Sequence, residues 1–127
     1  MIKKVLLPWL PAALTMVAIF CFSSIPSNKL PNSGLLDLVV KKGGHMLGYG
    51  LLALAYWYGL RFQKGRWWLA LLLAILYAMT DEFHQSFVSG RHPSWVDVLV
   101  FDGGGAVIML GLANWWRAGR KSALNSE

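Results

Sequence analysis

The chain has 127 residues, of which 56% are apolar and only 14% are charged, whereas a typical soluble domain has about 25% charged residues. Its seven Trp, six Phe and four Tyr add more apolar surface than so short a chain can bury around one core. Its low charge excludes a disordered chain, and the single Cys21 excludes an intramolecular disulfide scaffold. The composition predicts one membrane domain over residues 1–127, in which lipid covers the excess apolar side chains.

Four apolar stretches, each bounded by charged residues, predict membrane-spanning helices. The stretches are residues 5–25, 43–60, 67–88 and 95–116. The third needs its polar extension, because its uncharged part, residues 67–80, makes only roughly 21 Å of helix against a hydrocarbon core of about 30 Å. The expected fold class is therefore an all-α membrane protein, a bundle of four transmembrane helices.

The basic residues predict how this bundle is oriented. Most of them belong to the two tails and the second connection, namely Lys3, Lys4, Arg61, Lys64, Arg66, Arg117, Arg120 and Lys121. By the positive-inside rule, both termini are expected to be cytoplasmic. Because the basic residues bracket the spans and do not form one soluble basic face, nucleic acid is not an expected partner, despite the net charge of +6.

Polar residues gather at the outer ends of the second, third and fourth spans. On the second span, Lys42, His45 and Tyr49 are spaced i, i+3 and i+7 and therefore share one face. Ionisable groups at membrane depth are costly and point to a function. We expect a polar pocket that opens to the outer leaflet. Its candidate catalytic residues are Glu82, Asp97 and His45, and its candidate substrate-binding residues are Lys42, Arg91, Gln85, Ser94, Tyr49 and Asp81.

Two chemical interpretations of these residues stay open. In the first, a phosphate or pyrophosphate headgroup is attracted by Lys41, Lys42, Arg91 and His92. Acid–base work is then done by Glu82, Asp97 and His45. In the second, a divalent metal is bound by His45 and His84 with carboxylates from Asp81, Glu82 or Asp97. No H-E-x-x-H pattern and no cysteine set supports the metal, so no metal ligand is assigned and the cofactor is left unknown.

Plainer structural roles also fit several of these residues. Ser94 is a suitable N-cap for the fourth span, with Asp97 in its first turn. Arg91 could pair with Asp81 or Glu82 to fix the third connection. Close helix packing, which permits a homo-oligomer without requiring one, is expected at Gly44, Gly48, Gly103, Gly104 and Gly105.

The polar run DEFHQSFVSGR at residues 81–91, followed by Ser94, Asp97 and a glycine-rich span, resembles the signature of the VanZ-like family of small bacterial membrane proteins. FSS at residues 22–24 and Lys42, His45 and Tyr49 agree with it, so that the resemblance covers about residues 15–112. Two departures are Asp102, where such proteins often carry asparagine, and His84, at a variable position, which weakens the metal interpretation. The motif matches residue by residue at Glu82, Gln85, Arg91, Ser94, Asp97, His45 and Lys42.

The resemblance implies a multi-pass protein of the bacterial plasma membrane with a role in the cell envelope, and through the family's founding member an effect on susceptibility to teicoplanin. It names no reaction, so whether the chain is an enzyme stays open. We expect it to recognise, and as an enzyme to modify, an anionic lipid or a lipid-linked envelope precursor. The alternative is a non-catalytic accessory subunit, in which ion pairs among Glu82, Arg91 and Asp97 fix the helix packing.

Overall fold

The computed structural model describes residues 1–30 and 34–125, whose regular secondary structure is entirely helical, without any strand. Residues 31–33 of the first predicted connection and residues 126–127 of the predicted domain lie outside the described residues. The longer helices are α2 (Leu10–Ser23), α3 (Leu35–Gly59), α4 (Trp67–Gln85) and α6 (Gly103–Leu124). The shorter elements are α1 (Ile2–Leu6), η1 (Leu7–Trp9), η2 (Ser27–Lys29), η3 (Lys64–Arg66), α5 (Trp95–Asp97) and η4 (Val98–Asp102). The predicted all-helical fold is confirmed.

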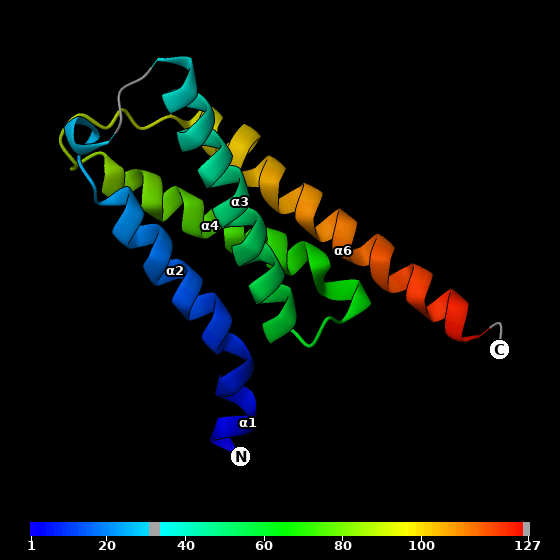
Figure 1. The fold of residues 1–127 in the computed structure, drawn as a ribbon. Coiled ribbons are helices and arrows are strands. Elements are labelled where there is room, and N and C mark those ends of the chain that lie inside the picture. Colours follow the sequence, from blue (N-terminus) through cyan, green and yellow to red (C-terminus); the bar gives the residue numbers. More distant parts are fainter. Residues whose placement is uncertain (31–33, 126–127) are drawn as a thin grey trace.

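The four longer helices alternate in direction along the chain (Figure 1). One end of the molecule, here called the basic end, holds α1, η3 and the end of α6, so both chain termini lie there. The other end, here called the polar end, holds η2, the beginning of α3 and the connection 86–94 between α4 and α5. The polar run at residues 81–91 therefore lies at the opposite end from both termini.

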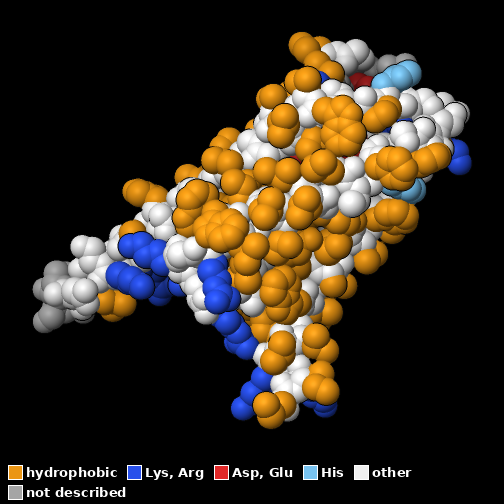
Figure 2. All heavy atoms as spheres, turned by 180° about the vertical axis from the view of Figure 1, so that it is seen from behind, with side chains coloured by type: hydrophobic (Ala, Val, Ile, Leu, Met, Phe, Trp, Pro, Cys, Tyr) orange, Lys and Arg blue, Asp and Glu red, His pale blue; other side chains and the backbone are white. Residues whose placement is uncertain are grey.

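Among the residues that the structure describes, two continuous helical segments are long and apolar enough to cross a membrane. Ile2–Ser23 has a mean hydropathy of 2.1 and Trp95–Leu124 has a mean hydropathy of 1.8. Figure 2 shows hydrophobic side chains over the middle of the molecule, with Lys and Arg side chains gathered toward the basic end. An exposed apolar surface of this extent fits contact with lipid.

The second predicted span is part of a longer helix. α3 begins at Leu35 and not at residue 43, so Lys41 and Lys42 lie on the helix instead of in the connection before it. Asp37 lies in its first turn, where an acidic side chain interacts favourably with the helix dipole. Lys41 Nζ lies 2.8 Å from Asp37 Oδ2, as expected for an i, i+4 pair. The first turns of α3 are thus stabilised by charge, a signal that a search for apolar runs does not register.

The other spans differ from the prediction at their ends. α4 ends at Gln85 and not at Val88, because the chain turns after the polar residues. The fourth span continues through Leu124, since the basic residues after residue 116 remain helical.

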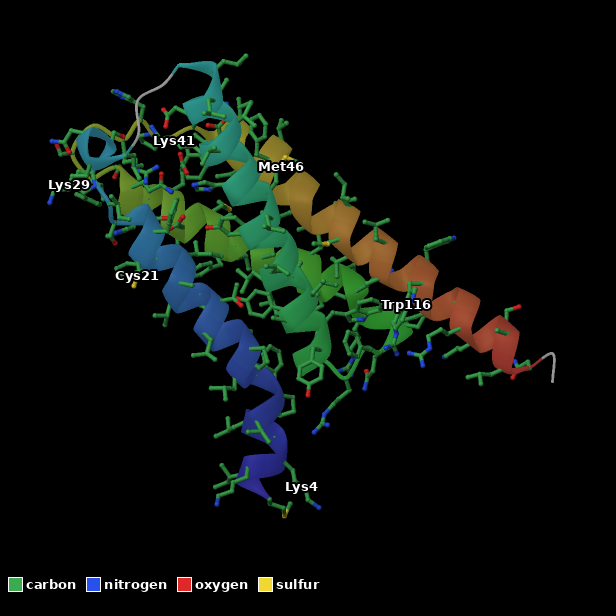
Figure 3. All side chains as sticks on the ribbon, viewed as in Figure 1. Lys4, Cys21, Lys29, Lys41, Met46 and Trp116 are labelled. Carbon is green, nitrogen blue, oxygen red and sulfur yellow. The ribbon has the colours of Figure 1, made fainter. Side chains whose placement is uncertain are left out.

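α3 lies at the centre of the bundle and packs most closely on α6. A Cβ atom at Gly50 would lie 2.9 Å from Met109 Cγ, and one at Gly105 would overlap the backbone carbonyl of Met46. Met46 accordingly lies where α3 faces α6 (Figure 3). The expected close packing is confirmed at Gly105, and small residues are the usual means by which membrane helices approach. The prediction is wrong for Gly44 and Gly104, around whose Cβ positions no described atom lies within 4 Å.

Candidate functional site

A polar cavity of about 320 Å³ lies at the polar end of the molecule. Figure 3 shows nitrogen and oxygen atoms gathered between the helices at this end, where Lys29 and Lys41 lie. α3, α4, the connection 86–94 and the start of the last helix supply its walls. The ionisable side chains lining it are Asp37, Lys41, Lys42, His45, Glu82, Arg91, His92, Asp97 and Asp102. We refer to this space as the polar cavity.

The structure brings most of the predicted site residues to this cavity. Lys42, His45, Glu82, Gln85, Arg91 and Asp97 all line it. Ser94 touches the site through Glu82, because its backbone N–H donates a hydrogen bond to the Glu82 carboxylate. The predicted residues Tyr49 and Asp81 lie deeper, in a buried hydrogen-bonded group beside the cavity.

The start of the last helix is fixed by Ser94. Its Oγ accepts a hydrogen bond from the backbone N–H of Asp97 at 3.3 Å, which confirms the predicted N-cap. Lys42 Nζ reaches across from α3 to Asp97 Oδ1 at 3.0 Å and lies 4.3 Å from the centre of the Phe101 ring. α3, the end of α4 and the last helix therefore meet through Lys42, Glu82 and the Ser94 cap.

A π-helical turn, η4, brings a second aspartate to the cavity. In a regular α-helix Asp97 and Asp102, five positions apart, would point about 140° away from each other. In η4 the backbone pairs residues i and i+5, so both aspartates line the polar cavity. Asp102 Oδ1 lies 3.2 Å from His45 Nδ1. Asp102 was not among the predicted site residues, and regular α-helical spacing from Asp97 would not have placed it in this cavity.

Asp81 connects three helices beneath the cavity. Its Oδ2 accepts hydrogen bonds from Ser23 of α2 at 2.7 Å, from Tyr49 of α3 at 3.0 Å and from Gln85 of its own helix at 3.0 Å. The side chain is only 3% exposed, and its Oδ1 has no hydrogen-bond partner among the described residues. A buried carboxylate with three donors holds α2, α3 and α4 together.

The predicted pairing of Arg91 with Asp81 or Glu82 is not found; its partners are backbone carbonyls. Its Nε donates to the carbonyl of Ile25 at 3.2 Å and its Nη2 to the carbonyl of Phe22 at 3.3 Å. Phe22 lies in the last turn of α2, where its carbonyl also accepts from the backbone N–H of Ile25 at 3.2 Å, and Ile25 follows the end of the helix. Gly90, with a φ of +73°, turns the chain so that Arg91 reaches these carbonyls. The predicted ion-pair cluster of Glu82, Arg91 and Asp97 is therefore wrong.

His84 faces away from the polar cavity. Its Nε2 lies 3.0 Å from Ser24 Oγ, and its ring centre lies 4.4 Å from that of Phe20 on α2. His84 and His45 therefore do not meet, contrary to the metal interpretation. Within residues 1–30 and 34–125, no group of three His, Cys, Asp or Glu side chains is arranged to hold a metal ion.

In the polar cavity every carboxylate has a hydrogen-bond donor, whereas the cationic side chains keep N–H groups that can still donate. Each of its four carboxylates has a donor. These donors are Lys41 for Asp37, Lys42 for Asp97, His45 for Asp102 and the backbone of Ser94 for Glu82. A lysine has three N–H groups and an arginine five, so Lys41, Lys42 and Arg91 keep donors beyond their described hydrogen bonds. The arrangement suits an additional acceptor, such as a phosphate oxygen.

The comparisons with known proteins give one family. A family model described as VanZ/LLP1 matches residues 8–117, which include every residue that lines the polar cavity. No curated protein and no solved structure matches the chain.

Proposed function

We propose, since the chain belongs to the VanZ/LLP1 family, that it is a multi-pass protein of the bacterial plasma membrane whose polar cavity binds an anionic lipid or a lipid-linked envelope precursor at the outer leaflet. The observation that carries the proposal is the set of N–H donors that Lys41, Lys42 and Arg91 retain in a cavity whose carboxylates all have partners. A phosphate group would accept hydrogen bonds from these side chains without displacing an existing ion pair.

The topology of this proposal has four spans with both termini in the cytoplasm. It is supported by the alternating direction of α2, α3, α4 and α6 (Figure 1) and by the basic residues that collect at the end of both termini (Figure 2). α4 has 19 residues, or roughly 28 Å of helix, which approaches the thickness of the hydrocarbon core. The polar cavity would then face the outside of the cell.

Cysteine labelling of whole cells tests this orientation. In a Cys21→Ser background, Ser89→Cys in the connection 86–94 should react with a membrane-impermeant maleimide. Lys64→Cys in η3 should react only after the cells are lysed. Labelling of position 64 from outside would place the polar cavity on the cytoplasmic side and contradict the proposal.

The pair of His45 and Asp102 is the group in the cavity best suited to proton transfer. A histidine whose other ring nitrogen is held by a carboxylate has a fixed orientation and can accept or donate a proton at its free nitrogen. Should the chain modify its lipid, His45 would act as the acid–base group, with Glu82 beside the headgroup.

The second candidate function is a non-catalytic accessory subunit. Its support is that Asp81 and Arg91 make hydrogen bonds that hold α2 to the other helices, which is a structural use of the polar run. In this alternative an effect on teicoplanin susceptibility would be indirect.

Lipid binding by matched lysine variants separates the two candidates. Phosphatidic acid is titrated in detergent into the wild type, Lys42→Gln in the cavity and Lys64→Gln at the basic end. We expect Lys42→Gln to weaken binding by about tenfold or more, because a charge-assisted hydrogen bond is lost, and Lys64→Gln to leave it unchanged. The teicoplanin susceptibility of cells carrying each variant is measured in parallel. Equal binding by all three proteins would reject the headgroup site and favour the accessory subunit.

A further inference from the structure

A second cavity, of about 470 Å³, lies between α2 and α3. We refer to it as the apolar groove. Its walls include Leu14, Ile19 and Phe22 of α2 and Gly44, Gly48 and Leu51 of α3. The rim is open to the side of the molecule, since Leu14 is 62% exposed and Leu51 46%. The volume falls within the about 300–1,000 Å³ typical of small-molecule sites.

The groove exists because α2 and α3 separate toward the polar end (Figure 1). Near the basic end, η1, which leads into α2, packs closely on α3, since a Cβ atom at Gly59 would lie 2.8 Å from the Trp9 ring. At Gly48 the nearest neighbour would be Ile19 at 3.6 Å, and at Gly44 no described atom lies within 4 Å. α2 therefore still makes van der Waals contact at Gly48, and at Gly44 the space beside α3 is open.

The side chains that line the groove are mostly apolar and provide few hydrogen-bonding groups for a ligand. Three of its lining residues carry hydroxyl groups, and each hydroxyl donates its proton elsewhere. Thr15 donates to the carbonyl of Pro11 at 2.8 Å, and Ser23 and Tyr49 both donate to Asp81. An apolar chain in the groove would therefore leave no hydroxyl donor of the lining unsatisfied, whereas a polar ligand would find few partners.

The apolar groove is adjacent to the polar cavity. His45 lines both of them. Ser23 borders the groove and Gln85 borders the polar cavity, and Gln85 Nε2 lies 3.4 Å from Ser23 Oγ. A thin layer of side chains thus separates a site for hydrocarbon from a site for an anion. The two sites together match the two parts of an amphiphile.

We infer that the apolar groove holds one hydrocarbon chain of the lipid whose anionic headgroup occupies the polar cavity. The inference rests on the proposed function and specifies its ligand as a membrane lipid, which enters sideways between α2 and α3, and not as a soluble anion. Because the groove opens toward the side of the bundle, the chain can pass from the bilayer without crossing water.

Two neighbouring glycines of α3 provide a matched pair of variants. Gly44→Leu places a side chain in the groove, where the added Cβ meets no described atom within 4 Å. Gly43→Leu makes the same change one position earlier, where the Cβ is equally unobstructed and the residue does not line the groove. At neither position does the added Cβ overlap a described atom, so we expect both variants to fold.

The experiment uses phosphatidic acid with a photoactivatable diazirine on one acyl chain, incorporated with the full-length protein in phosphatidylcholine vesicles. Crosslinked peptides are mapped by mass spectrometry. We expect crosslinks to the groove-facing parts of α2 and α3 in the wild type and in Gly43→Leu. In Gly44→Leu they should fall by about tenfold or more, because the new side chain takes the space of the acyl chain. Glycerol 3-phosphate, a headgroup without chains, should bind directly with the same Kd to all three proteins.

Each other outcome overturns the inference in a distinguishable way. Undiminished crosslinking in Gly44→Leu, or crosslinks spread evenly over the outer faces of α4 and α6, would remove the groove as the chain site while headgroup binding stands. A crosslink between two copies of the chain, with the groove protected from lipid, would make the occupant a helix of a second copy. Failure of the wild type to bind phosphatidic acid or glycerol 3-phosphate would reject the proposed function together with the inference.

Discussion

The two sides of α3 use glycine for opposite purposes. On the side of α6, Gly50 and Gly105 are required because the helices approach so closely that an added Cβ would meet Met109 or the backbone of Met46. On the side of α2, Gly44 and its neighbour Gly48 line an open groove. Small residues on a membrane helix therefore indicate close packing only where the facing helix also comes near.

The two sides also differ in what holds the helices together. α6 is held to α3 mainly by packing, whereas α2 is held at the polar end by the hydrogen bond that Ser23 donates to Asp81 and by those that Arg91 donates to backbone carbonyls. Because α2 is attached by hydrogen bonds at its polar end, the apolar groove between α2 and α3 can stay open for a ligand. Packing along the other side supplies the rigid support that a binding site needs.

The largest effect on stability is expected on the side of α3 that packs against α6. Gly105→Leu should destabilise the protein by about 3 kcal/mol or more, since the new side chain meets backbone that cannot move aside. The matched control is Gly104→Leu, whose Cβ meets no described atom within 4 Å. Unfolding in mixed SDS and dodecyl maltoside micelles measures the difference. Equal stability of the two variants would contradict the close contact of α3 with α6.

Asp81→Leu should have the next largest effect. It leaves the hydroxyls of Ser23 and Tyr49 and the amide of Gln85 without their buried acceptor, at a cost of about 2–4 kcal/mol. Asp81→Asn retains one acceptor oxygen and should cost less. The same unfolding assay compares them, and an Asp81→Leu protein as stable as the wild type would show that the carboxylate does not hold α2.

Arg91→Gln should cost about 1–2 kcal/mol, because two hydrogen bonds to the end of α2 are lost. Lys29→Gln, at the same end of the molecule, is a control for which we expect a change within about 0.5 kcal/mol. If Arg91 also binds the headgroup, the folded fraction of Arg91→Gln should bind phosphatidic acid more weakly than wild type. Unchanged binding would restrict Arg91 to its structural role.

The smallest effect on stability is expected on the side of α3 that lines the apolar groove. Gly44→Leu should remain within about 1 kcal/mol of the wild type, and Gly43→Leu should shift by the same amount, since both gain helix propensity and neither meets an obstacle. Thermal unfolding in detergent without added lipid measures both. A strong destabilisation of Gly44→Leu alone would mean that the groove is closed in the protein.

Apolar runs predict the four longer helices because burial in lipid or in the bundle requires their composition. They do not predict the start of α3 at Leu35, which depends on the charge pair of Asp37 and Lys41. Nor do they predict that α6 continues through its basic residues. Charged helical ends carry no hydropathy signal, so the bounds of the spans are less predictable than their existence.

Helical spacing correctly placed Lys42 and His45 together, because α3 is regular there. The partner of His45 could not be predicted in this way, since the π-helical turn shifts Asp102 onto a different face. The contact of Arg91 was also missed, because its acceptors are backbone carbonyls that no side-chain pattern records.

Native mass spectrometry of the gently purified protein, with lipid identification on the same sample, tests the central claim that α3 faces a bound lipid on its open side. We expect a co-purified anionic lipid on the wild type and on Gly43→Leu, and its loss from Gly44→Leu, the variant that fills the apolar groove. If all three proteins carried the same lipid in equal amount, the groove would not be its binding site.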